Sequence, residues 1–161
     1  YWEDYIAPIP EAERDDMLVA YHKRLTGNNE IARMGAAKAW SQWEGRTLSI
    51  NPTSSMINHF SEPRTALSVA CLEAHYFMNN CFFEDNQLLA NADKIRDIPG
   101  YIIHGRYDMI CQVKQAFDLH KVWPIADLNI VPATGHAASE AGIVNALIDA
   151  GNGMLSKLKE G

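Results

Sequence analysis

Hydrophobic residues in the first part of the chain recur every three or four positions, the spacing of one face of an α-helix. This spacing predicts helices over residues 10–25, 31–44 and 64–80, and a short helix over 85–92. The stretch 46–63 is polar and is expected to be irregular. The helix over 64–80 is hydrophobic almost all round, which predicts that it is buried.

The pattern changes at Pro99. Short β-branched runs at 100–104 and 127–131 alternate with helical patterns at 112–122 and 139–157, as in a parallel sheet covered by helices. We therefore expect an α/β fold with a helical region over residues 1–98 and an α/β region over 99–161. Two strands rarely form a stable open sheet, so further strands are expected from elsewhere.

Composition narrows the function further. The 161 residues carry a net charge of −6 without a cluster of Lys and Arg, which argues against a nucleic-acid partner. No hydrophobic run approaches the roughly 20 residues that span a membrane. An odd number of cysteines, Cys71, Cys81 and Cys111, with no Cys-x-x-Cys pair, predicts a cytoplasmic protein without structural zinc.

Two side chains with catalytic potential follow the two predicted strands. Asp108 comes after Ile-Ile-His-Gly-Arg-Tyr, and His136 comes after Val-Pro-Ala-Thr-Gly. Parallel strands joined by one helix bring their carboxyl ends to the same edge of a sheet, where ligand sites form. Asp before His is the order of the last two members of an α/β-hydrolase triad, so we interpret Asp108 as the acid and His136 as the base.

The third member of such a triad is a serine in a Gly-x-Ser-x-Gly turn, and the chain contains no such sequence. The chain also begins at Tyr1 rather than at Met. We therefore expect that a preceding segment carries the nucleophile and that the 161-residue chain alone is inactive.

Two helices each place one carboxylate among aromatic residues: Glu44 follows Trp43, and Glu73 precedes Tyr76. Burying an unpaired carboxylate is costly, so a cation is expected beside Glu73. An internal arginine such as Arg46 is one candidate, and a cation of the substrate, such as a peptide amino terminus, is the other.

Several segments resemble the proline iminopeptidases, which are serine peptidases. The matching segments are Tyr-Ile-Ala-Pro-Ile-Pro at 5–10, Tyr-His-Lys-Arg-Leu-Thr-Gly at 21–27, Ala-Trp-Ser-Gln-Trp-Glu-Gly at 39–45, Glu-Ala-His-Tyr-Phe at 73–77, Ile-Ile-His-Gly-Arg-Tyr-Asp at 102–108 and Gly-His at 135–136. The segments Trp-x-x-Trp-Glu and Glu-x-His-Tyr-Phe are not general features of hydrolases. Their joint occurrence makes the resemblance specific.

The resemblance implies an α/β-hydrolase fold in which residues 1–98 form a helical cap with its connections and 99–161 end the catalytic domain. It also implies that Asp108 and His136 are the triad acid and base. Glu44 and Glu73 would bind the imino group of an N-terminal proline, with Trp43 and Tyr76 as walls for its ring. No metal or cofactor is implied.

We therefore interpret the chain as part of a serine aminopeptidase that removes N-terminal proline from peptides, with the missing N-terminal half of the same protein as its partner. Two alternatives stay open. One is another α/β-hydrolase with a cap, either an esterase or an aminopeptidase of broader preference. The other is a helical binding module or fragment without catalytic activity.

Overall fold

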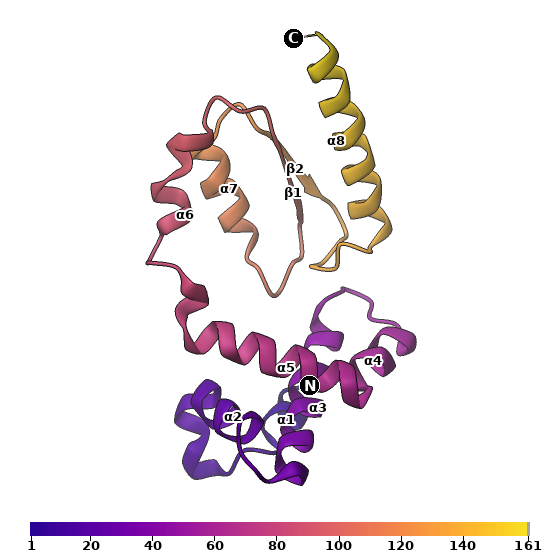
Figure 1. Cartoon of the computed structure of the whole chain (residues 1–161). Helices are drawn as coiled ribbons and strands as arrows, with labels where there is room; N and C mark the ends of the chain where they lie inside the picture. Colours follow the sequence, from indigo (N-terminus) through magenta and orange to yellow (C-terminus); the bar gives the residue numbers. More distant parts are fainter. Residues whose placement is uncertain (161) are drawn as a thin grey trace. The chain divides into compact units, whose positions relative to one another are not determined.

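The computed structural model describes the backbone of residues 1–160 and the side chains of residues 1–159. Two units are distinguished by their internal contacts (Figure 1). The first contains residues 1–47 and 51–84, and the second contains 48–50 and the residues from Asp85 onward. The main division thus falls after Glu84 rather than at the expected residue 98, because residues 87–95 contact the helix at 113–122.

The first unit is entirely helical in its described regular elements. These are α1 (Trp2–Ile6), η1 (Glu11–Asp16), α2 (Met17–Leu25), α3 (Glu30–Thr47), α4 (Ser54–Ser61), α5 (Pro63–Met78) and η2 (Asn80–Phe82). Its core joins Tyr21 and Leu25 of α2, Trp40 of α3 and three alanines of α5. The helices predicted over 31–44 and 64–80 are confirmed with shifted ends, whereas the helix predicted over 10–25 is divided into η1 and α2 at Asp16.

Helix α4 lies in the stretch that was expected to be irregular, so that prediction was wrong. Thr53 caps this helix by accepting a hydrogen bond from the Met56 amide at 3.2 Å. Helix α3 also continues through Gly45 instead of ending there. A Cβ atom at Gly45 would lie 2.9 Å from the Cβ of Phe60, so glycine permits the close packing of α3 and α4.

The prediction that α5 is buried all round was also wrong. Ala66, Ala70 and Ala74 form its buried face, whereas Leu72 and Phe77 are exposed. The small alanines let α5 approach α3 and α2 closely, and Leu67 and Val69 also pack against this core, whereas Leu72 faces solvent.

The second unit contains the sheet. Its elements are α6 (Gln87–Ala90), η3 (Ala92–Ile95), β1 (Tyr101–Gly105), α7 (Val113–Val122), β2 (Asp127–Val131) and α8 (Ala141–Glu160). Strands β1 and β2 are parallel and pair from Tyr101 with Asp127 to Gly105 with Val131. The predicted strand–helix–strand–helix order is confirmed, and with it the α/β class.

Helices α7 and α8 flank the two strands (Figure 1). Ile102 packs in the cluster that contains Ala116 of α7, whereas Ile103 packs against Val131 and against Ile143 of α8. Successive side chains of a strand point to opposite faces of a sheet, so both faces are hydrophobic and each receives one helix. The short β-branched runs noted in the sequence agree with this arrangement.

Two further observations concern the described part of the chain. None of its helices is both long and hydrophobic enough to cross a membrane. Cys71, Cys81 and Cys111 form no disulfide bond with one another and are partly buried.

Candidate active site

Asp108 is held by the turn that follows β1. Its Oδ1 accepts hydrogen bonds from the backbone amides of Ile110 at 2.9 Å and Cys111 at 2.8 Å. An aspartate side chain that accepts hydrogen bonds from backbone amides two or three residues later in the chain commonly stabilises a turn. Only 4% of the Asp108 side chain is exposed. One carboxylate oxygen is therefore committed to the turn, and Oδ2 is left for another donor.

His136 lies in the loop that follows β2. The amides of His136 and Ala137 both donate to the carbonyl of Leu48, at 2.9 and 2.8 Å. The amide of Gly135 donates to the carboxylate of Glu140 at 2.8 Å. These bonds fix the backbone on both sides of His136, so the position of the imidazole is set by the loop.

The two predicted triad residues meet in this unit. Asp108 Oδ2 lies 2.9 Å from His136 Nδ1. An ionised carboxylate only accepts hydrogen bonds, so Nδ1 carries the proton and Nε2 of a neutral imidazole carries the lone pair. The imidazole is 34% exposed. This is the tautomer in which a histidine can take a proton from a hydroxyl.

His104, on β1, adds a second histidine to the Asp108 turn. Its Nε2 lies 2.9 Å from the carbonyl oxygen of Cys111 and 3.6 Å from Asp108 Oδ2. Because a carbonyl only accepts, Nε2 of His104 must carry a proton. His104 lies in the run predicted as a strand over 100–104, but the sequence gave no sign that the residue lies beside the carboxylate.

The approach of the two loops depends on glycine at the end of β1. A Cβ atom on Gly105 would lie 1.9 Å from the carbonyl oxygen of Gly135, which no side chain could tolerate. The amide of Tyr107 also donates to the carbonyl of Thr134 at 2.9 Å. The loops that carry Asp108 and His136 therefore touch through their backbones.

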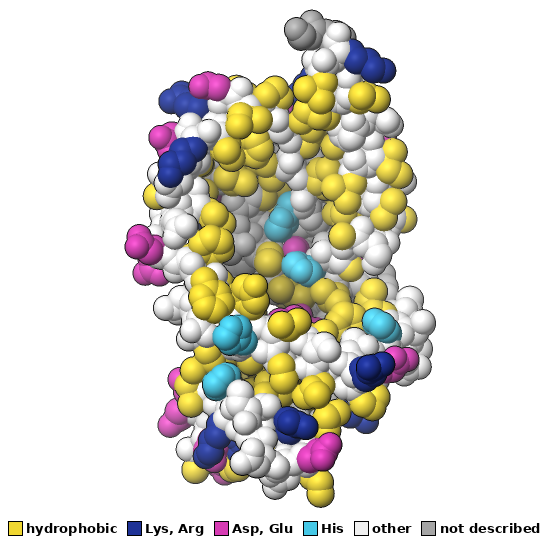
Figure 2. Space-filling view, viewed as in Figure 1, with side chains coloured by type: hydrophobic (Ala, Val, Ile, Leu, Met, Phe, Trp, Pro, Cys, Tyr) yellow, Lys and Arg dark blue, Asp and Glu magenta, His cyan; other side chains and the backbone are white. Residues whose placement is uncertain are grey.

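A pocket of about 330 Å³ opens onto the Asp108–His136 pair. His104 also lines it, and hydrophobic side chains from β1 and α8, among them Ile103 and Leu147, form other parts of its wall. On the face shown in Figure 2, histidine and acidic side chains lie together with hydrophobic side chains next to them. The His136 imidazole, which is 34% exposed, is thus accessible from this pocket, whereas Asp108 stays buried.

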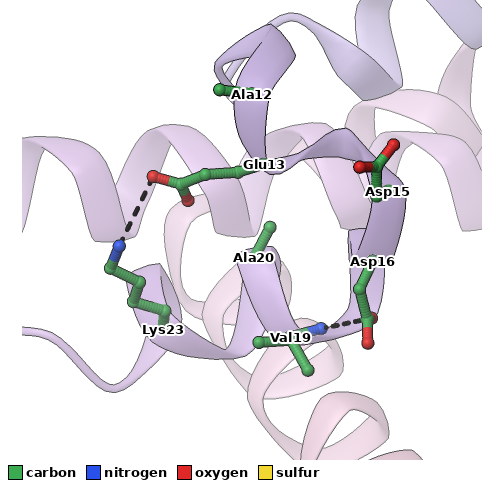
Figure 3. A pocket seen from close by; sticks show the side chains of 7 residues that line it. All are labelled: Ala12, Glu13, Asp15, Asp16, Val19, Ala20 and Lys23. Atoms are coloured by element: carbon green, nitrogen blue, oxygen red, sulfur yellow. Dashed lines mark hydrogen bonds and ion pairs between the residues drawn. The ribbon is translucent and has the colours of Figure 1, made fainter.

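A second pocket, of about 290 Å³, lies in the helical unit (Figure 3). The charged side chains that line it stabilise the fold. Glu13 pairs with Arg24 at 2.8 Å and with Lys23 at 3.4 Å, and the Arg24 hydrogen bond lowers the pKa of Glu13. Asp16 caps α2 by accepting from the Val19 amide. These carboxylates are engaged in salt bridges and capping, and no histidine lines the pocket.

Glu44 and Glu73 both lie in the helical unit and are partly buried. Glu73 Oε2 accepts a hydrogen bond of 2.6 Å from the indole Nε1 of Trp40. The pKa of Tyr5 rises to about 12 because the phenol is buried and because the charges of Glu44 and Glu73 disfavour a tyrosinate. Both carboxylates therefore lie near one phenol.

The two predicted aromatic walls occupy different ring groups. The Trp43 ring lies 5.1 Å from that of Tyr5, close to the phenol that both glutamates affect. Tyr76 is half exposed and contacts Phe82, with ring centroids 5.5 Å apart. Trp43 is thus placed with the glutamates, whereas Tyr76 packs in another cluster.

Arg46, a suggested internal partner for Glu73, forms an ion pair with Asp4. Its guanidinium also lies over the Tyr1 ring, 5.0 Å from the centroid. The charge of Arg46 is therefore engaged at α1. The hydrogen bond from Trp40 to Glu73 had no signal in the sequence, because it joins residues 33 positions apart on two helices.

Parallel strands between helices, with an Asp–His pair just past the strand ends, define an α/β protein with an acid–base site. No family model matches the chain. The chain is 48% identical over 153 residues to the proline iminopeptidase of Xanthomonas citri, covering 94% of this chain and 49% of that protein. It is 49% identical over 148 residues to the proline iminopeptidase of Xylella fastidiosa strain 9a5c, covering 91% of this chain and 47% of that protein.

A plant relative shows the same similarity. The proline iminopeptidase of Arabidopsis thaliana is 43% identical over 155 residues, covering 95% of this chain and 41% of that protein. The resemblance to proline iminopeptidases is therefore confirmed over nearly the whole chain. The chain spans about half the length of the curated relatives it matches.

Proposed function

We propose that this chain is part of a serine aminopeptidase that removes proline from the N-terminus of peptides. The observation that carries the proposal is the hydrogen bond of 2.9 Å between Asp108 Oδ2 and His136 Nδ1. The similarity to proline iminopeptidases over more than nine-tenths of the chain supports the choice of substrate.

In this proposal a serine hydroxyl comes from polypeptide outside the 161 residues. His136 Nε2 takes the hydroxyl proton as the serine oxygen attacks the carbonyl carbon of the N-terminal prolyl residue. Asp108 stabilises the resulting imidazolium and keeps its orientation. The imidazolium then gives its proton to the leaving amine of the shortened peptide. In the second step His136 takes a proton from water, the water attacks the acyl-enzyme, and proline is released as the serine oxygen regains the proton.

The selectivity for a free N-terminus comes from Glu44 and Glu73 in this proposal. A prolyl N-terminus is a secondary ammonium at neutral pH, and two carboxylates attract a cation that also carries a small hydrophobic ring. The Trp43 ring, near Tyr5, supplies a hydrophobic wall. Tyr76 has weaker support as a wall, because it contacts Phe82 in a separate cluster.

The corresponding architecture is an α/β-hydrolase with a helical cap. The helical unit, up to Glu84, would form the cap, and the unit with β1 and β2 would end the catalytic domain. The partner of the chain is the remaining half of the same protein, which would add the nucleophile and further strands. Three cysteines that form no disulfide with one another agree with the proposed cytoplasmic location.

The proposal is tested with a chimera that joins this chain to the part of the Xanthomonas citri relative that the chain does not cover. The substrates are a prolyl amide with a free imino group and its N-acetyl analogue. We expect the free substrate to be cleaved on the order of 100-fold faster, because acetylation removes the charge that the glutamates bind. A folded chimera that cleaves both at the same rate would contradict the proposal, and the unmodified relative is the control.

A further inference from the structure

Trp40 lies in the core of the helical unit, on α3, with only 5% of its surface exposed. A buried indole N–H requires an acceptor, and this one donates to Glu73 Oε2 on α5 at 2.6 Å. A hydrogen bond to a carboxylate is shorter and stronger than one between neutral groups. The bond therefore constrains the Glu73 side chain as well as satisfying the indole.

The indole is itself held in place by rings from three other helices. Its centroid lies 6.1 Å from Tyr5 of α1, 5.1 Å from Tyr21 of α2 and 6.2 Å from Phe77 of α5. Trp40 therefore has little freedom to turn. Because packing holds the indole N–H in place, the hydrogen bond also holds the Glu73 carboxylate that accepts it. A supporting residue commonly sets the geometry of a binding group in this way.

The donor is also neutral. Arginine or lysine in the place of Trp40 would bind the carboxylate and cancel its charge at the same time. An indole N–H stabilises the carboxylate and leaves its negative charge intact. Burial, and then the charges of Glu44 and Glu73, raise the pKa of the neighbouring Tyr5 phenol.

We propose that Trp40 is a positioning residue for Glu73: its indole N–H fixes the orientation of the charged Glu73 carboxylate for a cationic ligand, which under the proposed function is the imino group of an N-terminal proline. This inference rests on the proposed function for the identity of the ligand. The hydrogen bond and its constraint on Glu73 do not depend on it.

The first test is the Trp40→Phe variant of the chimera described above. Phenylalanine keeps an aromatic ring in the core, and it removes the N–H donor together with part of the ring volume. We expect KM for the prolyl amide to rise about 10-fold, the effect of losing a hydrogen bond to a charged group, with kcat changed by less than about two-fold. Unchanged KM in a folded variant would overturn the proposal.

The matched control is Trp123→Phe. The Trp123 indole also donates a hydrogen bond of 2.9 Å, but to the carbonyl of Ile98 in the other unit. This variant loses the same type of donor without affecting Glu73, so we expect KM to stay unchanged. Equal increases in KM for the two variants would assign the effect to general loss of stability, and the proposal would fail.

The second test uses the 161-residue chain itself and needs no activity. The NMR resonance of the Trp40 indole proton is expected to shift as pH falls through the ionisation of Glu73, because protonation weakens the bond. The Glu73→Gln variant is expected to abolish that shift. A resonance that does not respond to pH in the unmodified chain would overturn the proposal, even if Trp40→Phe fails to fold.

These tests separate the two claims. A chimera that shows no preference for a free prolyl N-terminus contradicts the proposed function, whatever the NMR titration shows. An indole resonance that does not follow Glu73 contradicts the positioning role, even when the chimera prefers prolyl substrates.

Discussion

Asp108 Oδ2 and His136 Nδ1 lie 2.9 Å apart although 28 residues separate them in the chain. The parallel pair β1 and β2, joined through α7, brings their carboxyl ends together. The turn after β1 then uses one oxygen of Asp108 for the amides of Ile110 and Cys111, which leaves the other oxygen for the imidazole.

This division of the two oxygens predicts the effect of Asp108→Asn. The Ile110 and Cys111 amides need an acceptor, so the amide oxygen of asparagine would occupy the Oδ1 position and its NH₂ group would face His136. Nδ1 would then have to accept, and the proton would move to Nε2, where it blocks base catalysis. We expect kcat of the chimera to fall on the order of 10³–10⁴-fold.

The control for this variant is Asp127→Asn. Asp127 pairs with Lys157 at 2.8 Å on the surface of the same unit and is 60% exposed. Its loss removes a carboxylate without touching the acid–base pair, so kcat is expected to stay the same. Steady-state kinetics on the prolyl amide measure both variants, and a normal kcat for Asp108→Asn would show that the pair is not catalytic.

Gly105→Ala is expected to destabilise the second unit. The new methyl group would lie 1.9 Å from the Gly135 carbonyl oxygen, so the two loops must separate. We expect a loss of about 2 kcal/mol in the free energy of unfolding, as for overpacking in a rigid site. Urea unfolding of the chain, followed by circular dichroism, measures this change.

The matched substitution Gly151→Ala, in α8, is expected to increase stability instead. No atom lies within 4 Å of a Cβ placed there, and alanine favours a helix more than glycine does. Gly151→Ala should therefore raise the free energy of unfolding by roughly 0.5–1 kcal/mol. Similar effects of the two substitutions would argue against the close approach of the two loops.

Glu44→Gln and Glu73→Gln distinguish a prolyl aminopeptidase from an esterase with a cap. Each variant removes one charge and changes the shape of the side chain little. We expect KM of the chimera for the free prolyl amide to rise about 10–100-fold, while hydrolysis of a small neutral ester stays nearly constant. A parallel loss on both substrates would instead favour a structural role for the two glutamates.

The raised pKa of Tyr5 predicts a loss of stability at alkaline pH. The ordinary pKa of the phenol is 10.0, and burial followed by the charges of Glu44 and Glu73 raises it to about 12. The protonated phenol is thus favoured in the folded chain. Its contribution to stability is complete below pH 10 and is lost as the pH rises toward 12.

Tyr5→Phe should therefore reduce the fall in melting temperature between pH 10 and 12. The Tyr21 phenol, whose pKa is also raised by burial, leaves a residual dependence. Tyr107→Phe serves as the control, because Tyr107 is exposed. If Tyr5→Phe and Tyr107→Phe have the same alkaline profile, the pKa of Tyr5 is not raised as described.

The regular elements of the second unit could be predicted from the sequence because each has a local cause. The β-branched run at 127–131 gives β2 with the predicted bounds, and the periodic stretch that follows β1 gives α7. Helix α4 was missed although Met56, Ile57 and Phe60 have helical spacing. The polar residues around them, from Asn51 to Ser55 and from Ser61 to Glu62, obscured that short pattern.

The candidate site was predictable only in part, for a similar reason. Asp108 and His136 each follow a recognisable strand, so topology alone suggests that they meet. The Trp40–Glu73 bond and the place of His104 beside Asp108 depend on tertiary packing. These residues lie in the recognised segments, but the segments do not show which side chains meet.

The central claim is that His136 is the base of a serine peptidase, oriented by Asp108. Its most direct test compares prolyl amide hydrolysis by the chimera and by its His136→Ala variant. We predict turnover by the chimera and a loss in kcat of at least about 10³-fold in the variant. Equal rates for the two folded proteins would contradict the account.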